Sequence, residues 1–375
     1  MEAKIYSYSL LVSLVLMIFF GIYFILGRIP SKKEYSSYRI SRSIMGVALL
    51  TLSVNYLTHL LVQPRFMNPL YAIFMNLSTY YLEAWLFSCA LMELLKKDYL
   101  TKRLFTLHIL SWISYTVIWT LILVILPNRG YLHLSALFGM AVWFVIYSFR
   151  LARRLYITYK RAVKAFDDYH SDDIELYIKW MSRFTYWAVV FGVGVGLLTF
   201  IPNHYIYLWI ISAIPFYIYL FCSYMNYLLF CEQVNEILES GMLWEEEVEK
   251  NDAQNGLECP DYFDDISSNL SKWLESRQYT TQGLNVAQVA EALNTNRTYL
   301  YEFIKYKYDI SFREWINNLR IEYAKQRMVH NPNETVSEIA EKAGYISMSN
   351  FSKLFSEAEG TTPFKWRKLH IESMD

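Results

Sequence analysis

The chain has 375 residues, of which 54% are hydrophobic and 18% aromatic, and its formal net charge at pH 7 is zero. The length suits two domains, and the apolar content is too high for an ordinary soluble domain. The charge is also uneven: residues 1–230 hold 20 Lys and Arg against 10 Asp and Glu, residues 231–270 hold one base against twelve acids, and residues 271–375 hold 14 bases against 13 acids. These segments indicate a membrane domain (1–230), an acidic juxtamembrane linker (231–262) and a third domain (263–375).

Seven apolar stretches precede Phe230, and each approaches the roughly 20 residues that a helix needs to cross a bilayer. The first stretch lacks the small-residue cleavage pattern of a signal peptide. We therefore predict a seven-helix transmembrane bundle, with spans at about 6–26, 44–62, 70–95, 105–126, 132–149, 184–201 and 205–229.

Cations set the expected orientation of the bundle. The loops between spans one and two, three and four, and five and six carry 17 Lys and Arg, whereas the other side carries only Lys4, Arg65 and Arg129. Positively charged loops stay in the cytoplasm. The N-terminus is therefore expected outside, and seven crossings bring the C-terminus into the cytoplasm.

Polar residues inside the bundle form a possible intramembrane ligand site. Asn76, Thr79 and Glu83 recur at helical spacing on the third span, and Asn55 and His59 follow the same spacing on the second. A carboxyl group at mid-membrane is costly and normally faces the interior of a bundle. Two interpretations remain open: a ligand or proton site, or a neutral or hydrogen-bonded Glu83 that locks two helices together.

No pattern in the membrane half indicates a metal, a cofactor or an enzyme. His59, His133 and His204 could sense pH or bind a metal, but their spacing matches no zinc pattern. The glycine-rich run from Gly192 to Gly196 lies inside span six, with no strand before it, so close helix packing explains it better than a nucleotide loop.

The linker is predicted to begin as a helix and then become irregular. Residues 231–239 continue span seven, and Val234, Ile237 and Leu238 form a short apolar stripe that could pair with a second copy in a homodimer. Residues 245–260 are acidic and rich in Asn, Gly and Asp, which is typical of a flexible spacer.

The third domain contains two helix-turn-helix patterns behind an amphipathic helix that starts at Phe263. In the first, Asn285 and Gln288 form a capping box, residues 294–296 make the turn, and the second helix covers about 297–308. A long helix follows. It opens with a box of Ser311 and Glu314 and ends at Asn331-Pro332.

The second pattern repeats this design. Thr335 and Glu338 form its capping box, Gly344 supplies the turn, and a helix covers about 349–357 before Gly360 ends it. We therefore expect an all-α chain whose last domain joins two helix-turn-helix units through one long helix.

Residues 284–369 resemble the DNA-binding domain of the AraC/XylS family of bacterial transcription regulators. The resemblance implies two recognition helices in adjacent major grooves, and a connecting helix of roughly 18 residues spans about 27 Å, close to the ~34 Å turn of the duplex. The matching residues are Arg320, Ala324, Gly344, Tyr345, Asn350, Phe351, Ser352, Phe355, Gly360, Thr362, Pro363 and Arg367.

Two departures from the family pattern affect the expected affinity. Asp309 stands where the family usually has Gly after the first recognition helix, and Ser356 replaces a usual basic residue. Affinity from counterion release grows with the number of phosphates neutralised, so each monomer is expected to bind DNA modestly.

The predicted DNA contacts are the outward positions of the two recognition helices. Arg297, Lys305, Asn350 and Lys353 are the strongest candidates, since Arg pairs well with guanine, Asn with adenine, and Lys often with phosphate. Arg367 is better suited to tie the last helix down or to touch phosphate than to read a base, and Tyr301 and Glu302 could be plain solvated surface. The full set is Arg297, Thr298, Tyr301, Glu302, Lys305, Met348, Asn350, Ser352, Lys353, Ser356 and Arg367.

Together these patterns predict a membrane-anchored one-component transcription regulator in a bacterial inner membrane, with its DNA-binding domain in the cytoplasm. Its expected partners are double-stranded DNA, the lipid bilayer, a second copy of the chain, and an unknown small-molecule or membrane signal. Two alternatives remain open: a transporter-like bundle that also regulates its gene, and a passive anchor for a DNA-binding domain that a partner controls.

Overall fold

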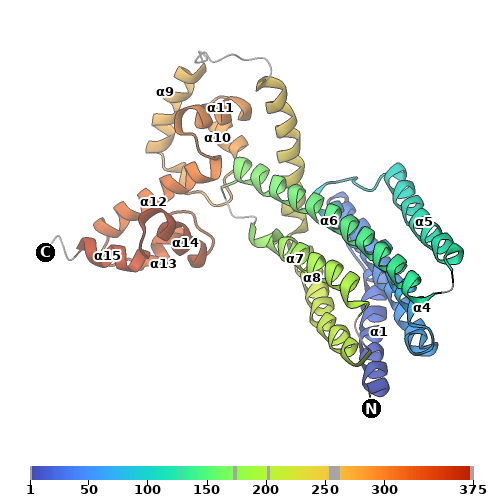
Figure 1. Cartoon of the computed structure of the whole chain (residues 1–375). Coiled ribbons are helices and arrows are strands. Elements are labelled where there is room, and N and C mark those ends of the chain that lie inside the picture. Colours follow the sequence, from blue (N-terminus) through green and yellow to red (C-terminus); the bar gives the residue numbers. More distant parts are fainter. Residues whose placement is uncertain (1, 128, 172–174, 201–202, 253–261, 372–375) are drawn as a thin grey trace. The chain divides into compact units, whose positions relative to one another are not determined.

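The computed structural model of the chain is all-helical over the residues that it describes, and these contain no strand (Figure 1). The chain divides into two compact units: residues 1–161 with 177–235, and residues 162–176 with 236–375. The all-α prediction is confirmed for the described residues, which are 2–127, 129–171, 175–200, 203–252 and 262–371.

Each predicted span corresponds to one long helix, although the spans predicted to end at about 62, 126 and 201 extend beyond the last helical residues, Leu61, Ile125 and Leu198. Two short elements, η1 (Lys33–Tyr35) and α3 (Pro64–Met67), lie between the first of these helices. The long helices are α1 (Glu2–Leu26), α2 (Ser36–Leu61), α4 (Pro69–Leu95), α5 (Lys102–Ile125), α6 (Gly130–Tyr169), α7 (Glu175–Leu198) and α8 (Asn203–Asp252).

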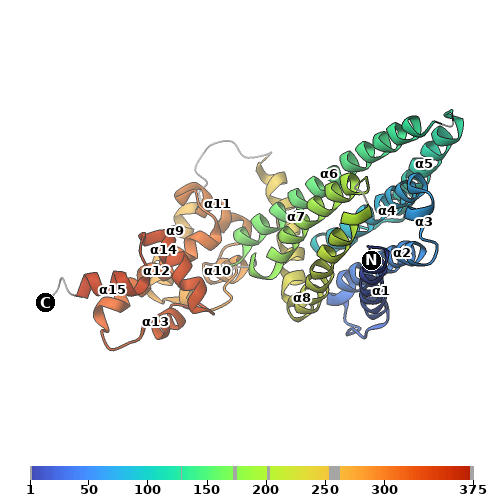
Figure 2. The same ribbon diagram turned by 60° about the horizontal axis from the view of Figure 1, so that its bottom comes forward.

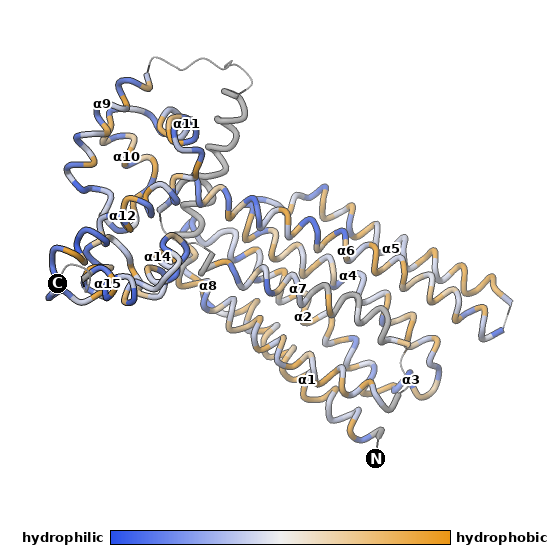
Figure 3. The backbone as a smooth tube through the Cα atoms, turned by 60° about the vertical axis from the view of Figure 1, so that its left-hand side comes forward, coloured by the Kyte–Doolittle hydropathy of each residue, from blue (hydrophilic) through white to orange (hydrophobic). Residues whose placement is uncertain are grey.

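Five helical segments in the described part of the chain are long and apolar enough to cross a membrane, and they belong to α1, α2, α5, α6 and α8. Helix α4 carries Glu83 and Glu93 and is not among the five. Helix α7 is not among them either, and many of its side chains lie outside the described residues. The hydrophobic colouring of these helices can be followed in Figure 3. Seven crossings and their orientation therefore remain predictions.

Glycines allow close helix packing inside the first unit. A Cβ atom on Gly46 would lie 2.9 Å from the carbonyl oxygen of Gly21, so only glycine lets α1 and α2, which lie side by side in Figure 2, approach so closely. A Cβ on Gly194 would lie 2.8 Å from the ring of Trp209 on α8. Close packing is thus confirmed for Gly194, and the surroundings of Gly192 and Gly196 lie outside the described part of the structure.

Two helices extend well beyond their predicted spans. Helix α6 continues to Tyr169, although the predicted span ended at about residue 149. Helix α8 continues to Asp252, so the predicted irregular spacer is wrong for residues 245–252, and residues 253–261 lie outside the described part. The acidic run favoured solvation in our prediction, but a solvated acidic segment can still propagate a long helix that packing has already nucleated.

The second unit is built from short helices around two separate cores. The first core receives side chains from α9, α10, α11 and the start of α12, and the second from the end of α12 and from α13, α14 and α15. The bounds are α9 (Tyr262–Glu275), η2 (Gln278–Thr280), α10 (Val286–Ala292), α11 (Arg297–Tyr308), α12 (Phe312–His330), α13 (Val336–Lys342), α14 (Met348–Glu359) and α15 (Pro363–Ile371).

Helix α12 therefore belongs to both cores. Phe312, Trp315 and Ile316 pack into the first core, and Ala324 and Met328 pack into the second. Because one rigid helix fills both cores, the two helix-turn-helix units hold a fixed spacing within the second unit.

Candidate nucleic-acid interface and intramembrane polar groups

The first helix-turn-helix unit begins with the predicted capping box. Asn285 Oδ1 accepts from the backbone N–H of Gln288 at 2.9 Å, and Gln288 Oε1 accepts from the N–H of Asn285 at 3.0 Å. Asn296 caps α11 by accepting from the N–H of Tyr299 at 2.8 Å. These caps satisfy orphan donors at the helix starts, and they fix where the recognition helix α11 begins.

The outer face of α11 matches the prediction only in part. Lys305 is exposed, and Arg297, Tyr301 and Glu302 are partly buried. Glu302 accepts a hydrogen bond from the hydroxyl of Tyr262, the first residue of α9, so the Glu302 carboxylate already has a partner within the protein. The expectation that Thr298 faces outward is wrong, since this side chain is 7% exposed. Neighbouring helices, which the periodicity of α11 cannot reveal, decide the exposure of its first turn.

Asp309 takes over the backbone role that glycine has in the family pattern. Its φ of 53° and ψ of 31° place it in the left-handed region at the C-cap of α11. A short polar residue tolerates this conformation better than most. Its carboxylate lies 3.0 Å from Lys305 Nζ, an exposed ion pair whose contribution to stability is small, so a DNA phosphate could displace it.

The second helix-turn-helix unit repeats this capping chemistry. Thr335 and Glu338 form the predicted reciprocal box, and Gly344 adopts a φ of +89° in the turn. A Cβ on Gly344 would lie 2.3 Å from the carbonyl oxygen of Thr280, so the turn requires glycine for space as well as conformation. For the predicted box of Ser311 and Glu314, the structure shows one of the two bonds, from Glu314 N–H to Ser311 Oγ at 3.2 Å.

Recognition helix α14 starts one residue earlier than predicted, because Ser347 caps it by accepting from the N–H of Asn350 at 3.2 Å. Met348 and Lys353 are exposed, whereas Asn350, Ser352 and Ser356 are partly buried. The five predicted contact residues of α14 therefore all retain accessible surface. Ser356 Oγ donates to the carbonyl oxygen of Ser352 at 2.7 Å, which explains how a serine is accommodated there.

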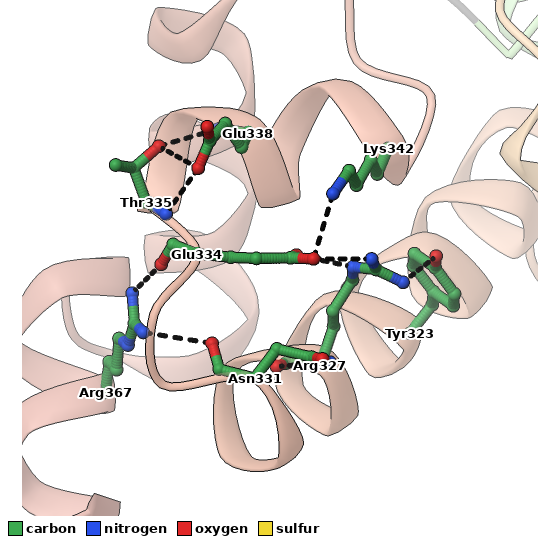
Figure 4. Close-up of polar contacts among 8 residues, drawn as sticks. All are labelled: Tyr323, Arg327, Asn331, Glu334, Thr335, Glu338, Lys342 and Arg367. Atoms are coloured by element: carbon green, nitrogen blue, oxygen red, sulfur yellow. Dashed lines mark hydrogen bonds and ion pairs between the residues drawn. The ribbon is translucent and has the colours of Figure 1, made fainter.

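Arg367 ties the last helix to the loop between α12 and α13. Its guanidinium donates to the carbonyl oxygens of Asn331, at 3.2 Å, and of Glu334 (Figure 4), and it also donates to that of Pro332. Of the two roles predicted for this residue, the structure shows the anchoring one. Three carbonyl acceptors occupy the guanidinium without any nucleic acid.

Glu334 is the centre of an ion-pair cluster in the same loop. Arg327 donates to both of its carboxylate oxygens at 2.6 Å, and Lys342 Nζ lies 2.9 Å from Oε1 (Figure 4). Hydrogen bonds from Arg327 and Lys342 lower the pKa of Glu334 from 4.5 to about 2. The cluster connects α12 to α13 across the loop between them.

Arg320 is a buried cation at the middle of α12, with 1% of its surface exposed. Its Nε donates to the carbonyl oxygen of Tyr279 at 2.9 Å, and its Nη2 donates to that of Thr281 at 2.6 Å. The guanidinium also lies over the ring of Tyr345. Arg320 therefore joins the loop before the first helix-turn-helix unit to the turn of the second.

Several surface residues near the recognition helices escaped prediction. Tyr306 is 65% exposed and Lys307 is exposed at the end of α11, and Ile346 is 66% exposed immediately before α14. The lysine could have been found, because Lys305 and Lys307 lie together in the last turn of α11. The exposed Ile346 gave no signal, since an isoleucine in a turn between helices normally indicates burial.

The five predicted intramembrane residues form two groups. Asn76 Oδ1 accepts from Asn55 Nδ2 at 3.3 Å and lies 2.7 Å from His59 Nε2, and Asn55 also donates to Thr79 at 3.1 Å. These four side chains connect α2 to α4. Glu83 lies one turn further along α4 and makes none of these bonds. A ligand site formed by all five residues therefore remains a prediction.

In the part of the chain that the structure describes, no group of three or more His, Cys, Asp or Glu side chains is arranged to hold a metal ion. His59 bonds to Asn76 and Tyr6, and His133 bonds to the backbone oxygens of Arg129 and Leu123. The side chain of His204 lies outside the described residues.

Replacing Arg320 by methionine should destabilise the second unit by about 2–3 kcal/mol, because two carbonyl groups lose their donor. Urea unfolding of residues 262–375, followed by tryptophan fluorescence, measures the change. Lys272→Met, on the exposed face of α9, is the control and should leave the midpoint unchanged. Equal midpoints for the two variants would show that the Arg320 contacts contribute nothing.

Acid should weaken the second unit through Glu334. Because its folded-state pKa of about 2 lies below the ordinary 4.5, its ion pairs contribute stability that is complete above about pH 4.5 and is lost as the pH falls towards 2. The melting temperature of residues 262–375 should therefore fall more steeply over this range than that of Glu334→Gln. Glu341→Gln, on the adjacent helix α13, should follow the unsubstituted protein; a Glu334→Gln profile that does the same contradicts the prediction.

Comparisons with known proteins cover the same part of the chain. A family model described as a helix-turn-helix domain matches residues 289–369. The Msm operon regulatory protein of Streptococcus mutans is 33% identical over 85 residues, which are 23% of this chain and 30% of that protein. The raffinose operon transcriptional regulatory protein RafR of Pediococcus pentosaceus is 34% identical over 100 residues, which are 27% of this chain and 35% of that protein.

A solved structure of a protein of unknown function from Listeria innocua matches 28% of this chain and 96% of its own, at 24% identity and a TM-score of 0.25. The chain spans about a third of the length of the two curated regulators above. Residues 289–369 therefore form an AraC-type helix-turn-helix domain, similar in sequence to the corresponding part of transcription regulators.

Proposed function

We propose that the chain is a membrane-anchored one-component transcription regulator, which binds specific double-stranded DNA and responds to a signal at the membrane. The observation that carries the proposal is the order of parts: long apolar helices precede an AraC-type helix-turn-helix domain whose two units share α12. A soluble DNA-binding protein has no need of these apolar helices.

In this proposal α11 and α14 enter successive major grooves. Helix α12 has 19 residues and is about 28 Å long at 1.5 Å per residue, which suits two grooves about one duplex turn apart. Asn350, in the first turn of α14, is placed to read a base, because the N-terminal residues of a recognition helix contact base edges. Lys305 and Lys353 are exposed cations suited to phosphates.

Two parts of the chain could carry a signal into the DNA-binding unit. One is the end of α6, because residues 162–176 belong to the second unit, and the other is α8, whose residues from 236 onward belong to it. Within that unit Asp167 Oδ1 accepts from Arg313 Nη1 on α12 at 2.8 Å. Since α12 fills both cores, a displacement of Asp167 would be transmitted through Arg313 and α12 to both recognition helices.

Asn350→Ala should lower affinity for the specific operator by about 5- to 150-fold, the value of one good base contact, and should relax discrimination at one base position. Lys353→Ala should weaken binding to all sequences and reduce the salt slope by about 1. Operator fragments recovered by chromatin immunoprecipitation supply the DNA, and fluorescence anisotropy measures binding. Lys272→Ala is the matched control; equal losses in all three variants would argue against α14 as a reader.

A topology map tests the membrane half of the proposal. Reporter fusions after Tyr35, Asp98 and Asp375 should be active in the cytoplasm, and fusions at Met67 and Pro127 should be active outside, because 17 of the 20 cations before residue 231 lie in the loops assigned to the cytoplasm. Protease protection of the C-terminal domain in sealed spheroplasts gives an independent measurement. A tail that protease digests from outside would overturn the proposal.

A further inference from the structure

A cavity of about 130 Å³ lies inside the first unit, between α2, α4, α6, α7 and α8. Its wall is mainly apolar and aromatic. A wall of this kind, interrupted by few polar groups, is typical of sites for small molecules. Leu52, Phe87, Phe144, Phe184, Ala213 and Phe216 supply much of it.

Two polar side chains of the wall have no partner. Glu83 on α4 is 4% exposed, and neither of its carboxyl oxygens has a hydrogen bond. Ser148 on α6 is 8% exposed, and its Oγ also has none. Buried polar groups normally find partners, and each one left without a partner costs free energy.

The neighbouring polar residues behave differently. His59, Asn76 and Thr79 make hydrogen bonds with other side chains of α1, α2 and α4, as structural polar groups do. In the alternative role, a neutral or hydrogen-bonded Glu83 locks two helices together; the hydrogen-bonded form of this role does not describe a carboxyl group without a partner. Its oxygens instead line a hollow space together with Ser148.

We propose that this cavity binds a small, largely apolar molecule that carries one hydrogen-bond donor, a hydroxyl or an ammonium group, which Glu83 accepts. An engineered protein cavity of about 150 Å³ holds benzene, so the apolar body should be about the size of one ring or a short branched chain. The site rests on the proposed function, because its ligand would be the signal that the regulator senses.

Three probes of matched size test the proposal on the full-length protein in lipid nanodiscs: 2-phenylethanol, 2-phenylethylamine and ethylbenzene. Isothermal titration calorimetry, with empty nanodiscs as the blank, measures binding. At least one donor probe should bind the unsubstituted protein at least tenfold more tightly than ethylbenzene, which has the ring but no donor. A cavity that holds only water would bind neither donor probe, and this result would overturn the proposal.

Substitutions locate the binding. Glu83→Met should reduce the preference for the donor probes to less than threefold, whereas Glu93→Met should keep it, because Glu93 lies on the same helix and is buried outside the cavity. Ala213→Leu should weaken all three probes by filling the space. Ser148→Ala, a milder change, should lower the preference and serves where Glu83→Met fails to fold. An unchanged preference in Glu83→Met would overturn the proposal. Where Glu83→Met fails to fold, an unchanged preference in Ser148→Ala together with unchanged probe affinities in Ala213→Leu would overturn it.

Operator binding, measured on the same nanodiscs without any probe, separates this proposal from the proposed function. Loss of probe binding with intact operator binding rejects the ligand site alone. Probe binding without any operator binding rejects the regulator and leaves the cavity as a ligand site of another kind of protein.

Discussion

The arrangement of the DNA-binding unit depends on one helix that fills two cores. Helix α12 places Phe312 and Ile316 in the first core and Ala324 and Met328 in the second, so neither helix-turn-helix unit can move without it. Protein cores are close-packed and resist small displacements. The distance between the two recognition helices is therefore a property of α12 and not of a flexible connection.

Arg320 supports this arrangement. It lies on α12 between the residues that pack into the first core and those that pack into the second. A buried guanidinium is costly unless its donors are paired, and here the carbonyl oxygens of Tyr279 and Thr281 pair two of them. The same loop carries Thr280, whose carbonyl oxygen meets Gly344 so closely that no Cβ fits. A cation, three carbonyl groups and a glycine thus fix the turn of the second helix-turn-helix unit against the loop that precedes the first one.

The sequence predicted those features that depend on nearby residues. The boxes at Asn285 and Thr335 are local, since each cap reaches a residue three positions along the same chain, and both are formed. The burial of Thr298 was missed because helices far along the chain decide it. Glu83 shares a helical face with Thr79, but one further turn along the axis places it at a cavity that only the packing of five helices creates. The continuation of α8 to Asp252 was not predicted, because the acidic composition of residues 245–252 indicates contact with solvent but does not indicate whether a helix continues.

Few cations remain for DNA once the internal contacts of the second unit are formed. Arg320 and Arg367 are occupied by backbone oxygens, and Arg327 is held by Glu334. Lys305 and Lys307 are exposed on α11, Lys305 in a pair that a phosphate can exchange, and Lys353 is exposed on α14. Because counterion release scales with the number of phosphates neutralised, we expect such a surface to give a single domain modest affinity. A second copy would change this result, because linking two domains makes the second binding event intramolecular and raises its effective concentration. Under the proposed function, an apolar anchor that holds copies in one membrane would provide this linkage, and the anchor would then have a physical role in DNA binding in addition to the proposed sensing.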